Sequence, residues 1–173
     1  MSAFTVRKAR MEDVPAMHGL LLASARQGLL LPRALIHLYG HVRNFMVAAD
    51  AAGRTVGCCA LAPVWEDLAE ICSLVVQDDL RRQGVGRLLV RACLEEGPTL
   101  GITRVFALTY QEGNAVIPSN MWRSDLAWRQ ISVLPQKIWA DCVHCAKYPD
   151  CDETAVFLNL TAPVAGVQGG NHV

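Results

Sequence analysis

Apolar side chains recur with a helical period near the start of the chain. Val14, Met17 and Leu21 lie three and four residues apart, and Asp13 stands where helices favour a capping side chain. The pattern predicts a first helix here. A second short helix is expected after the loop of residues 27–33.

Short apolar runs predict the strands. One spans residues 4–7, before the first helix. Residues 45–49 and 55–61 flank a turn that contains Gly53, which is the pattern of an antiparallel hairpin. Residues 70–76 are again rich in β-branched and apolar side chains, so three neighbouring strands are expected in this part of the chain.

The segment that follows has the clearest helical pattern in the chain. Apolar residues stand at positions i, i+3, i+4, i+7 and i+8 counted from Val85, and Gly97 with Pro98 ends the segment. A fifth strand is predicted over residues 104–109. Strand–helix–strand order implies a right-handed crossover and a locally parallel pair of strands, so the predicted core is α/β.

The pattern weakens in the last third of the chain. Pro118 interrupts the helical spacing, and we expect a broken helix within residues 111–133. A final strand is predicted over residues 154–160, and the Gly- and Ala-rich tail of residues 161–173 is expected to be disordered. One domain over residues 1–160 is the expected organisation.

Composition narrows the class of function. The 173 residues are 52% hydrophobic, and Lys+Arg and Asp+Glu balance at 16 each, which disfavours disorder and a nucleic-acid-binding surface. No apolar run approaches the roughly 18 residues that cross a bilayer, and no secretory signal is recognisable at the N-terminus. We expect a cytoplasmic protein that acts on a small molecule, without a nucleic-acid or membrane partner; homodimerisation stays open.

A cationic turn that contains two glycines opens the helix of residues 85–96. Its residues are Arg81, Arg82, Gln83, Gly84, Val85, Gly86 and Arg87. Glycines let a phosphate approach the N–H groups of a helix N-terminus, and arginines beside them add positive charge. A diphosphate on a phosphorylated nucleotide, as in coenzyme A, fits this pattern. Glycine is also common in turns that only join a strand to a helix, and that structural interpretation stays open.

Two other phosphate-binding motifs do not match this turn. A dinucleotide fingerprint follows the first strand and precedes an acidic residue by about 20 positions, and neither condition holds here. A Walker loop contains Gly-Lys followed by Ser or Thr, which is absent. Coenzyme A remains a ligand that fits the turn.

The spacing Arg81-x-x-Gly84-x-Gly86 resembles the signature that the GNAT superfamily of N-acetyltransferases carries after its fourth strand. The chain is further similar to the bacterial amino-acid N-acetyltransferases that make N-acetylglutamate for arginine synthesis. This similarity is carried by residues 6–13, 28–33, 69–76, 105–110 and 134–142. It implies a mixed, mostly antiparallel sheet whose fourth and fifth strands splay apart.

The resemblance also implies how acetyl-CoA is bound. The pantetheine arm would bond to backbone groups of Leu74, Val75 and Val76, which on their own indicate only a buried strand. The acetyl thioester would lie near Ser73 and Leu74, where a strand N–H can polarise its carbonyl. Glu70 would take the proton of the amine, although an acidic residue at a strand edge is often only solvated.

An amino-acid acceptor carries carboxylates, so its pocket should contain Arg or Lys. Arg33 is the leading candidate, because its loop covers the acceptor site in the family that the chain resembles. Arg7 and Lys137 are weaker candidates. Each of these side chains has the alternative of facing solvent or flanking a strand.

The general acid of the family has no counterpart here. It is often a tyrosine in a stretch that ends in Gly-Phe after the fifth strand, and residues 112–130 contain neither. Tyr110 is the nearest tyrosine, and we interpret it as an aromatic residue at a strand end. The departure leaves open an altered acceptor site, reduced activity or a locally corrupted sequence.

The seven cysteines divide into two groups. Cys58, Cys59, Cys72 and Cys93 lie in apolar segments and are expected to be small buried side chains in a reducing compartment. The second group is Cys142, Cys145 and Cys151. Its spacing is one ligand short of a closed structural zinc site, so zinc binding and free surface thiols both stay open.

The leading hypothesis from the sequence is acetyl transfer from acetyl-CoA to the α-amine of an amino acid, with L-glutamate first. A second hypothesis keeps acetyl-CoA and changes the acceptor to another small amine, a peptide or a protein N-terminus. A third is a non-catalytic module that binds acyl-CoA or metal. Acceptor-dependent thiol release distinguishes the first two hypotheses from the third.

Overall fold

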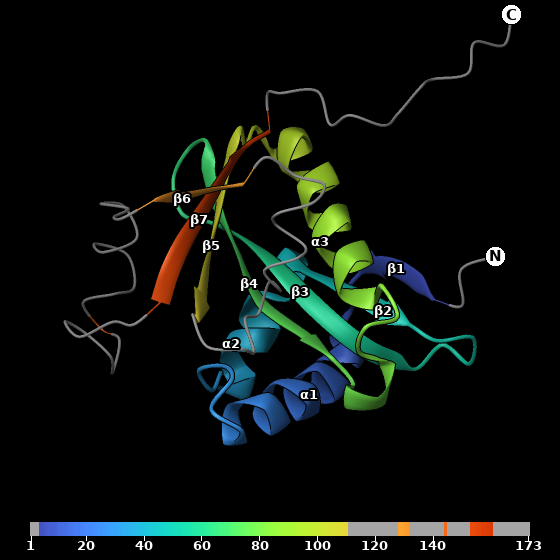
Figure 1. Cartoon of the computed structure of the whole chain (residues 1–173). Helices are drawn as coiled ribbons and strands as arrows, with labels where there is room; N and C mark the ends of the chain where they lie inside the picture. The colour runs from blue at the N-terminus through green and yellow to red at the C-terminus, as the bar shows by residue number, and fades with distance from the viewer. Residues whose placement is uncertain (1–3, 111–127, 132–143, 145–152, 161–173) are drawn as a thin grey trace, which may run out of the picture.

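A computed structural model describes residues 4–110, 128–131, 144 and 153–160. Helices and strands follow one another along the chain in the order β1, α1, α2, β2, β3, β4, α3, β5, β6 and β7 (Figure 1). Within the described stretches, no helix has both the length and the apolarity needed to cross a membrane.

The elements have the following bounds. The helices are α1 (Val14–Arg26), α2 (Leu35–Gly40) and α3 (Val85–Glu96). The strands are β1 (Thr5–Lys8), β2 (Phe45–Ala49), β3 (Thr55–Pro63), β4 (Leu68–Val76), β5 (Arg104–Tyr110), β6 (Arg129–Ile131) and β7 (Glu153–Asn159). Each strand predicted from the sequence is present, with its ends within two residues of the prediction.

The strands form one sheet in the order β1-β2-β3-β4-β5-β7-β6. Neighbouring strands are antiparallel except β4 and β5, which are parallel. The parallel pair flanks α3, as the strand–helix–strand pattern predicted. The mixed, mostly antiparallel α/β sheet is therefore confirmed.

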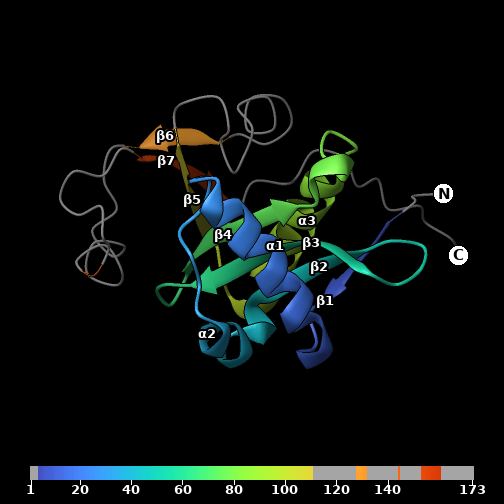
Figure 2. The same cartoon turned by 90° about the horizontal axis from the view of Figure 1, so that it is seen from below.

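Helices cover the two faces of the sheet separately. One buried cluster lies between α3 and the sheet and includes Leu89 and Val105. The other lies between the sheet and the α1–α2 pair and includes Met17, Leu38 and Val47. Figure 2 shows α1 and α2 on the near side of the sheet and α3 behind it. The alternating strand residues thus divide between two cores.

Strands β4 and β5 pair over only three residues. Leu68 lies opposite Arg104, and Glu70 lies opposite Phe106. Beyond Glu70, β4 continues beside β3, whereas β5 pairs with β7 as far as Tyr110, so the two strands separate (Figure 1). No described residue pairs with this edge of β4 after Glu70. The splayed pair expected from the family resemblance is present.

A network around Asp67 closes the narrow end of the opening. Its carboxylate accepts hydrogen bonds from Nε and Nη2 of Arg104, at 2.9 and 2.7 Å. Its carbonyl oxygen accepts the backbone N–H groups of Thr103 and Arg104. The Arg104 guanidinium lowers the pKa of Asp67, so this carboxylate stays charged. These contacts thus hold β4 and β5 together where they pair, and the two strands separate beyond Glu70.

The expected broken helix within residues 111–133 is wrong for its last described part. Residues Arg129–Ile131 form β6, which pairs with β7. Trp128 beside it is buried in the α3-side cluster. A strand of three residues shows no period in the sequence, because its pairing depends on a distant strand. The rest of that segment and the tail of residues 161–173 lie outside the described residues.

Candidate active site

An irregularity in β4 lies beside the point where β4 and β5 separate. Cys58 of β3 is opposite Val75, and Ala60 is opposite Cys72, so Ser73 and Leu74 together face one residue of β3. Ser73 has φ 53°, a left-handed conformation that is uncommon outside glycine. This is a β-bulge, and it re-aims the backbone groups that follow it. No sequence signal marks it, because serine rarely occupies that conformation.

Glu70 and Cys72 lie on the face of β4 that is turned toward α1 and α2. Cys72 packs against the cluster of that face, and Glu70 stands two residues earlier on the same strand. The Glu70 side chain is 6% exposed, so it is buried rather than solvated at a strand edge. A buried carboxylate at the opening of the sheet suits a proton acceptor better than a surface group.

Arg33 reaches this face from the loop between α1 and α2. Its Nη2 donates to Sγ of Cys72 at 3.5 Å. The residue remains exposed, so one side of its guanidinium is open to solvent. Arg33 and Cys72 are 39 positions apart along the chain. The fold therefore brings the predicted cation to a residue that lies two positions after Glu70 on β4.

The turn after β4 has the backbone that its glycines predicted. Gly84 is the N-cap of α3 with φ 85°, and Arg82 has φ 62°. Gly86 differs from Gly84. A Cβ built on Gly86 would come no closer than 3.8 Å to Val76, an ordinary contact. The backbone therefore favours glycine at position 84 and has room for a side chain at position 86.

Side chains around the turn are held by local contacts. Arg81 forms an ion pair with Asp78 at 2.7 Å, and Gln83 Nε2 donates to the Asp79 carbonyl oxygen at 3.1 Å. Arg81 is therefore shared with an acidic neighbour. Arg82 and Arg87 are the further cations that the turn carries, on either side of Gly84.

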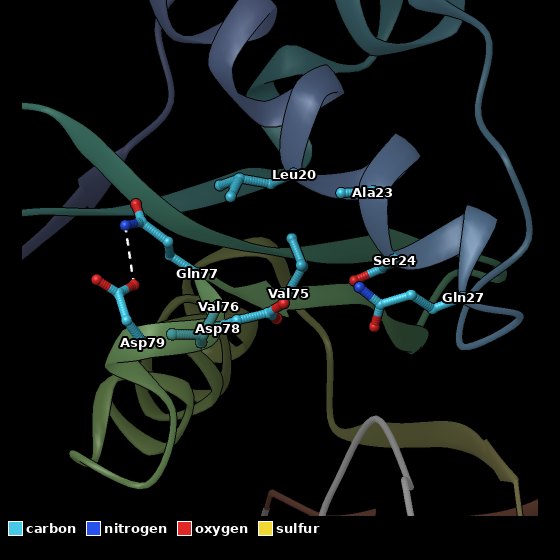
Figure 3. Close-up of a pocket in the computed structure, with 9 residues that line it drawn as sticks. All are labelled: Leu20, Ala23, Ser24, Gln27, Val75, Val76, Gln77, Asp78 and Asp79. Atoms are coloured by element: carbon cyan, nitrogen blue, oxygen red, sulfur yellow. Dashed lines mark hydrogen bonds between the residues drawn. The ribbon is translucent and has the colours of Figure 1, made fainter.

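A cavity of about 360 Å³ adjoins the end of β4. Figure 3 shows it between α1 and the β4 end. It is lined by Leu20, Ala23, Ser24, Gln27, Val75, Val76, Gln77, Asp78 and Asp79. The α1 residues in this set were not predicted, because nothing in their spacing distinguishes a cavity wall from an ordinary helix face.

Arg7 is not brought to this face of β4. It lies on β1, three strands away, and its guanidinium contacts both carboxylate oxygens of Asp13 at 2.7 and 2.8 Å. Burial alone would raise the pKa of Asp13, but hydrogen bonds from Arg7, from the backbone N–H of Arg10 and from Thr55 lower it to about 2. Asp13 therefore joins β1 and β3 to the start of α1 rather than capping α1 with its side chain.

The predicted cysteine core is present. Cys58, Cys59 and Cys93 are buried, Cys72 is half-buried, and all four are free thiols. Burial raises the pKa of Cys58, and a hydrogen bond with Cys93 together with burial raises that of Cys59. Cys58 and Cys59 therefore stay neutral and act as small apolar side chains.

The remaining candidates lie outside the described residues. They are Lys137, Cys142, Cys145 and Cys151. His144, beside them in the sequence, is described and exposed. Among the described residues, no group of three His, Cys, Asp or Glu side chains could hold a metal ion. Zinc binding stays a prediction.

Known sequences related to this chain are acetyltransferases. A model of the acetyltransferase (GNAT) family matches residues 14–118. An uncharacterized N-acetyltransferase of Chlorobaculum tepidum is 36% identical over 157 residues, which cover 90% of this chain and 96% of that protein. An amino-acid acetyltransferase of Mycobacterium tuberculosis is 39% identical over 108 residues, which are 61% of this chain and 62% of that protein. Amino-acid acetyltransferases of Neisseria meningitidis match over 25% of their length.

Solved structures share the fold. A Mycobacterium tuberculosis protein in complex with CoA and NLQ has a TM-score of 0.73 and 27% identity, covering 90% of this chain and 98% of that one. N-acetylglutamate synthase of Neisseria gonorrhoeae, complexed with coenzyme A and N-acetyl-glutamate, has a TM-score of 0.76 and 23% identity. It covers 92% of this chain and 36% of the synthase, and its likeness concerns the fold alone. With a family model matched over more than half of its length and a full-length relative at 36% identity, this chain belongs to the acetyltransferase (GNAT) family.

Proposed function

We propose that this GNAT enzyme transfers the acetyl group of acetyl-CoA to the α-amine of an amino acid, with L-glutamate as the leading acceptor and arginine biosynthesis as its setting. The observation that carries the proposal is the contact between Arg33 and Cys72, two residues from buried Glu70. Arg33, which can bind the carboxylate of an amino acid, and Glu70, which can take a proton from its amine, then lie at the same face of β4. Relatives named amino-acid acetyltransferase support the same acceptor class.

The described residues fit acetyl-CoA. The edge of β4 after Glu70 has no strand partner among them, so its N–H and C=O groups from Ser73 to Val76 can bond the amides of a pantetheine arm. The turn at Gly84 directs the N-terminus of α3, with its positive end, toward a diphosphate. Room beside Gly86 lets the ligand approach the backbone. The resulting path runs along β4 and ends at α3.

Chemistry at the acetyl group needs a neutral amine and a polarised carbonyl. Glu70 takes the proton of the ammonium group, directly or through water. The amine nitrogen bonds to the acetyl carbon, and the bond from that carbon to sulfur breaks. Backbone N–H groups at the Ser73 bulge hold the oxygen that becomes negative in between. The residue that protonates the leaving thiolate is not assigned.

Arg33 is the proposed anchor for the acceptor carboxylate. Its guanidinium is exposed and lies beside Cys72, so it can still form a bidentate contact with a ligand. Arg7 already uses its guanidinium on Asp13, and we assign it to the fold. Lys137 stays a candidate from the sequence.

Thiol release from acetyl-CoA, measured with each of the twenty amino acids, tests the proposal. L-Glutamate should give the fastest acceptor-dependent release, with amino acids that lack a second carboxylate slower. Release that does not depend on any amino acid, or equal rates with simple alkylamines, would contradict the acceptor class.

Arg33 can be tested on its own. Arg33→Ala should raise the KM for the amino acid about tenfold or more, because a charge-assisted contact is lost, while the Kd for CoA changes less than about twofold. Arg91→Ala is the matched control, because Arg91 lies on α3 in an exposed pair with Glu95. An unchanged KM for Arg33→Ala would remove Arg33 from the site.

A further inference from the structure

One wall of the cavity beside β4 is formed by α1, which the proposed mechanism does not use. Three of its residues, Leu20, Ala23 and Ser24, line the cavity together with the last residues of β4, and so does Gln27, which directly follows the helix. In Figure 3 the side chains of Ser24 and Gln27 extend from α1 toward Val75. The cavity lies between the opening of the sheet and the turn at Gly84.

Ser24 is an unusual polar residue for this position. Only 5% of the residue is exposed, which is uncommon for a serine. It lines the cavity, so the hydroxyl borders the space that a ligand would fill. A hydroxyl at this position can both donate a hydrogen bond to a ligand and accept one. Gln27 one turn later adds an amide that can both donate and accept.

The charges around the cavity select against an anionic ligand. Its acidic residues are Asp78 and Asp79, of which Asp78 pairs with Arg81 and Asp79 accepts a hydrogen bond from Gln77 at 2.9 Å. No Lys or Arg lines it. A diphosphate or an acceptor carboxylate would face two carboxylates here, whereas an uncharged ligand would not.

The chemistry of the lining matches the pantetheine arm of CoA. Leu20, Ala23 and Val75 form apolar walls for its methylene and methyl groups, and Ser24 and Gln27 suit its amides. We propose that α1 forms a second wall of the pantetheine site, with Ser24 and Gln27 bonding the amides on the side opposite the β4 edge. The proposal rests on acetyl-CoA being the co-substrate and extends the site to residues that the turn and β4 do not include.

Two probes separate the arm from the rest of the cofactor. CoA carries the pantetheine arm, whereas adenosine 3′,5′-bisphosphate carries the nucleoside with the 3′-phosphate and the first 5′-phosphate, and lacks both the second phosphate of the diphosphate and the arm. Titration calorimetry with both probes is carried out on the full chain and its variants. The unfolding midpoint of each variant is measured beside it.

Filling the cavity is the main test. Ala23→Leu should weaken CoA binding about tenfold or more by occupying the space, and adenosine 3′,5′-bisphosphate binding should stay within about twofold. Ala25→Leu is the matched control, because it makes the same change on the same helix outside the cavity lining. Ser24→Ala should weaken CoA binding about threefold to tenfold, through the loss of one hydrogen bond, and spare the nucleotide probe.

The outcomes distinguish this proposal from the proposed function. Equal losses for both probes, or no loss of CoA binding in Ala23→Leu and Ser24→Ala, would overturn it. A raised KM for the amino acid with unchanged CoA affinity would also overturn it, since the cavity would then hold the acceptor. If CoA binding responds as expected but no amino acid is acetylated, the α1 wall stands and the proposed function fails.

Discussion

At the scale of single residues, Ser73 concentrates the strain of the site. A non-glycine residue with φ 53° costs about 1–2 kcal/mol, and here it lies at the bulge that aims the backbone of β4 at the proposed thioester. Side chains that prefer extended backbone would resist this conformation. The strain is thus linked to the geometry that the reaction needs.

Substitutions at Ser73 should separate backbone strain from chemistry. The free energy of unfolding of Ser73→Gly should lie within about 1 kcal/mol of the wild-type value. Relief of strain in the folded state and the added freedom of the unfolded chain act in opposite directions. For Ser73→Val the free energy of unfolding should fall by about 2 kcal/mol or more, since β-branched residues disfavour positive φ. Urea denaturation gives both values. A fully stable Ser73→Val would show that the bulge can relax.

Asp13 predicts how stability depends on pH. Its folded pKa of about 2 lies below the usual 3.8, so its contribution is present above pH 4 and is lost as the pH falls toward 2. The shift corresponds to about 2 kcal/mol. Denaturation curves between pH 2 and pH 6 should show this loss in the wild type. Asp13→Asn should be less stable than the wild type at pH 6, and its free energy of unfolding should change less between pH 2 and pH 6. If the free energies of the variant and the wild type ran parallel over this range, Asp13 would not be the source of the pH dependence.

At the scale of elements, the connection from β4 to α3 carries the cofactor prediction. Gly84 and Gly86 lie two residues apart and serve different needs, because only Gly84 has a positive φ. The sequence motif treats them alike. The structure separates a glycine that the turn favours from one that the ligand would require.

Alanine substitutions should reveal this difference. Gly84→Ala should cost about 1 kcal/mol of folding free energy, because its φ is 85°. Gly86→Ala should leave stability unchanged or raise it by up to about 1 kcal/mol, since it lies inside a helix. Its CoA affinity should fall about tenfold or more if the ligand approaches the backbone there. Calorimetry and denaturation of the two variants, run side by side, measure both effects. Unchanged CoA affinity in Gly86→Ala would place the diphosphate elsewhere.

Local sequence patterns predict some elements of this fold and miss others. The helix at residues 85–96 and the strands around it follow from local spacing, and the parallel β4–β5 pair follows from the crossover between them. β6 was missed because three residues carry no period. The splay of β4 and β5 came from the family resemblance, since no local pattern encodes where two strands part.

At the scale of the whole molecule, the sheet is continuous where β4 and β5 pair and has a gap between these two strands beyond Glu70. The ion pair between Asp67 and Arg104 holds the paired end, and the α1–α2 pair and α3 cover opposite faces. Residues from the α1–α2 loop, β4 and the turn before α3 therefore converge at the gap. A ligand there would contact several elements at once.

Such a ligand should stabilise the entire fold. Acetyl-CoA at 100 times its Kd should add about 2.7 kcal/mol to the free energy of unfolding, and adenosine 3′,5′-bisphosphate should add as much only at its own, higher concentration. Hydrogen exchange should slow most at residues 73–76, where β4 pairs with β3 but has no described strand on its β5 side. Thermal scans and exchange mass spectrometry measure these effects. Protection confined to α3 would contradict a path along β4.

The sequence by itself determined the α/β elements, the parallel crossover and the cationic glycine turn, because these depend on spacing over a few neighbouring residues. Only the tertiary structure decided which candidates meet. It brought Arg33 to Cys72 and paired Arg7 with Asp13, and it turned Ser24 toward the cavity at the end of β4. Those outcomes depend on strand register, on a bulge and on the packing of α1 across the sheet. Such long-range contacts leave no period in the sequence, so the cofactor turn was predictable and the acceptor face was not.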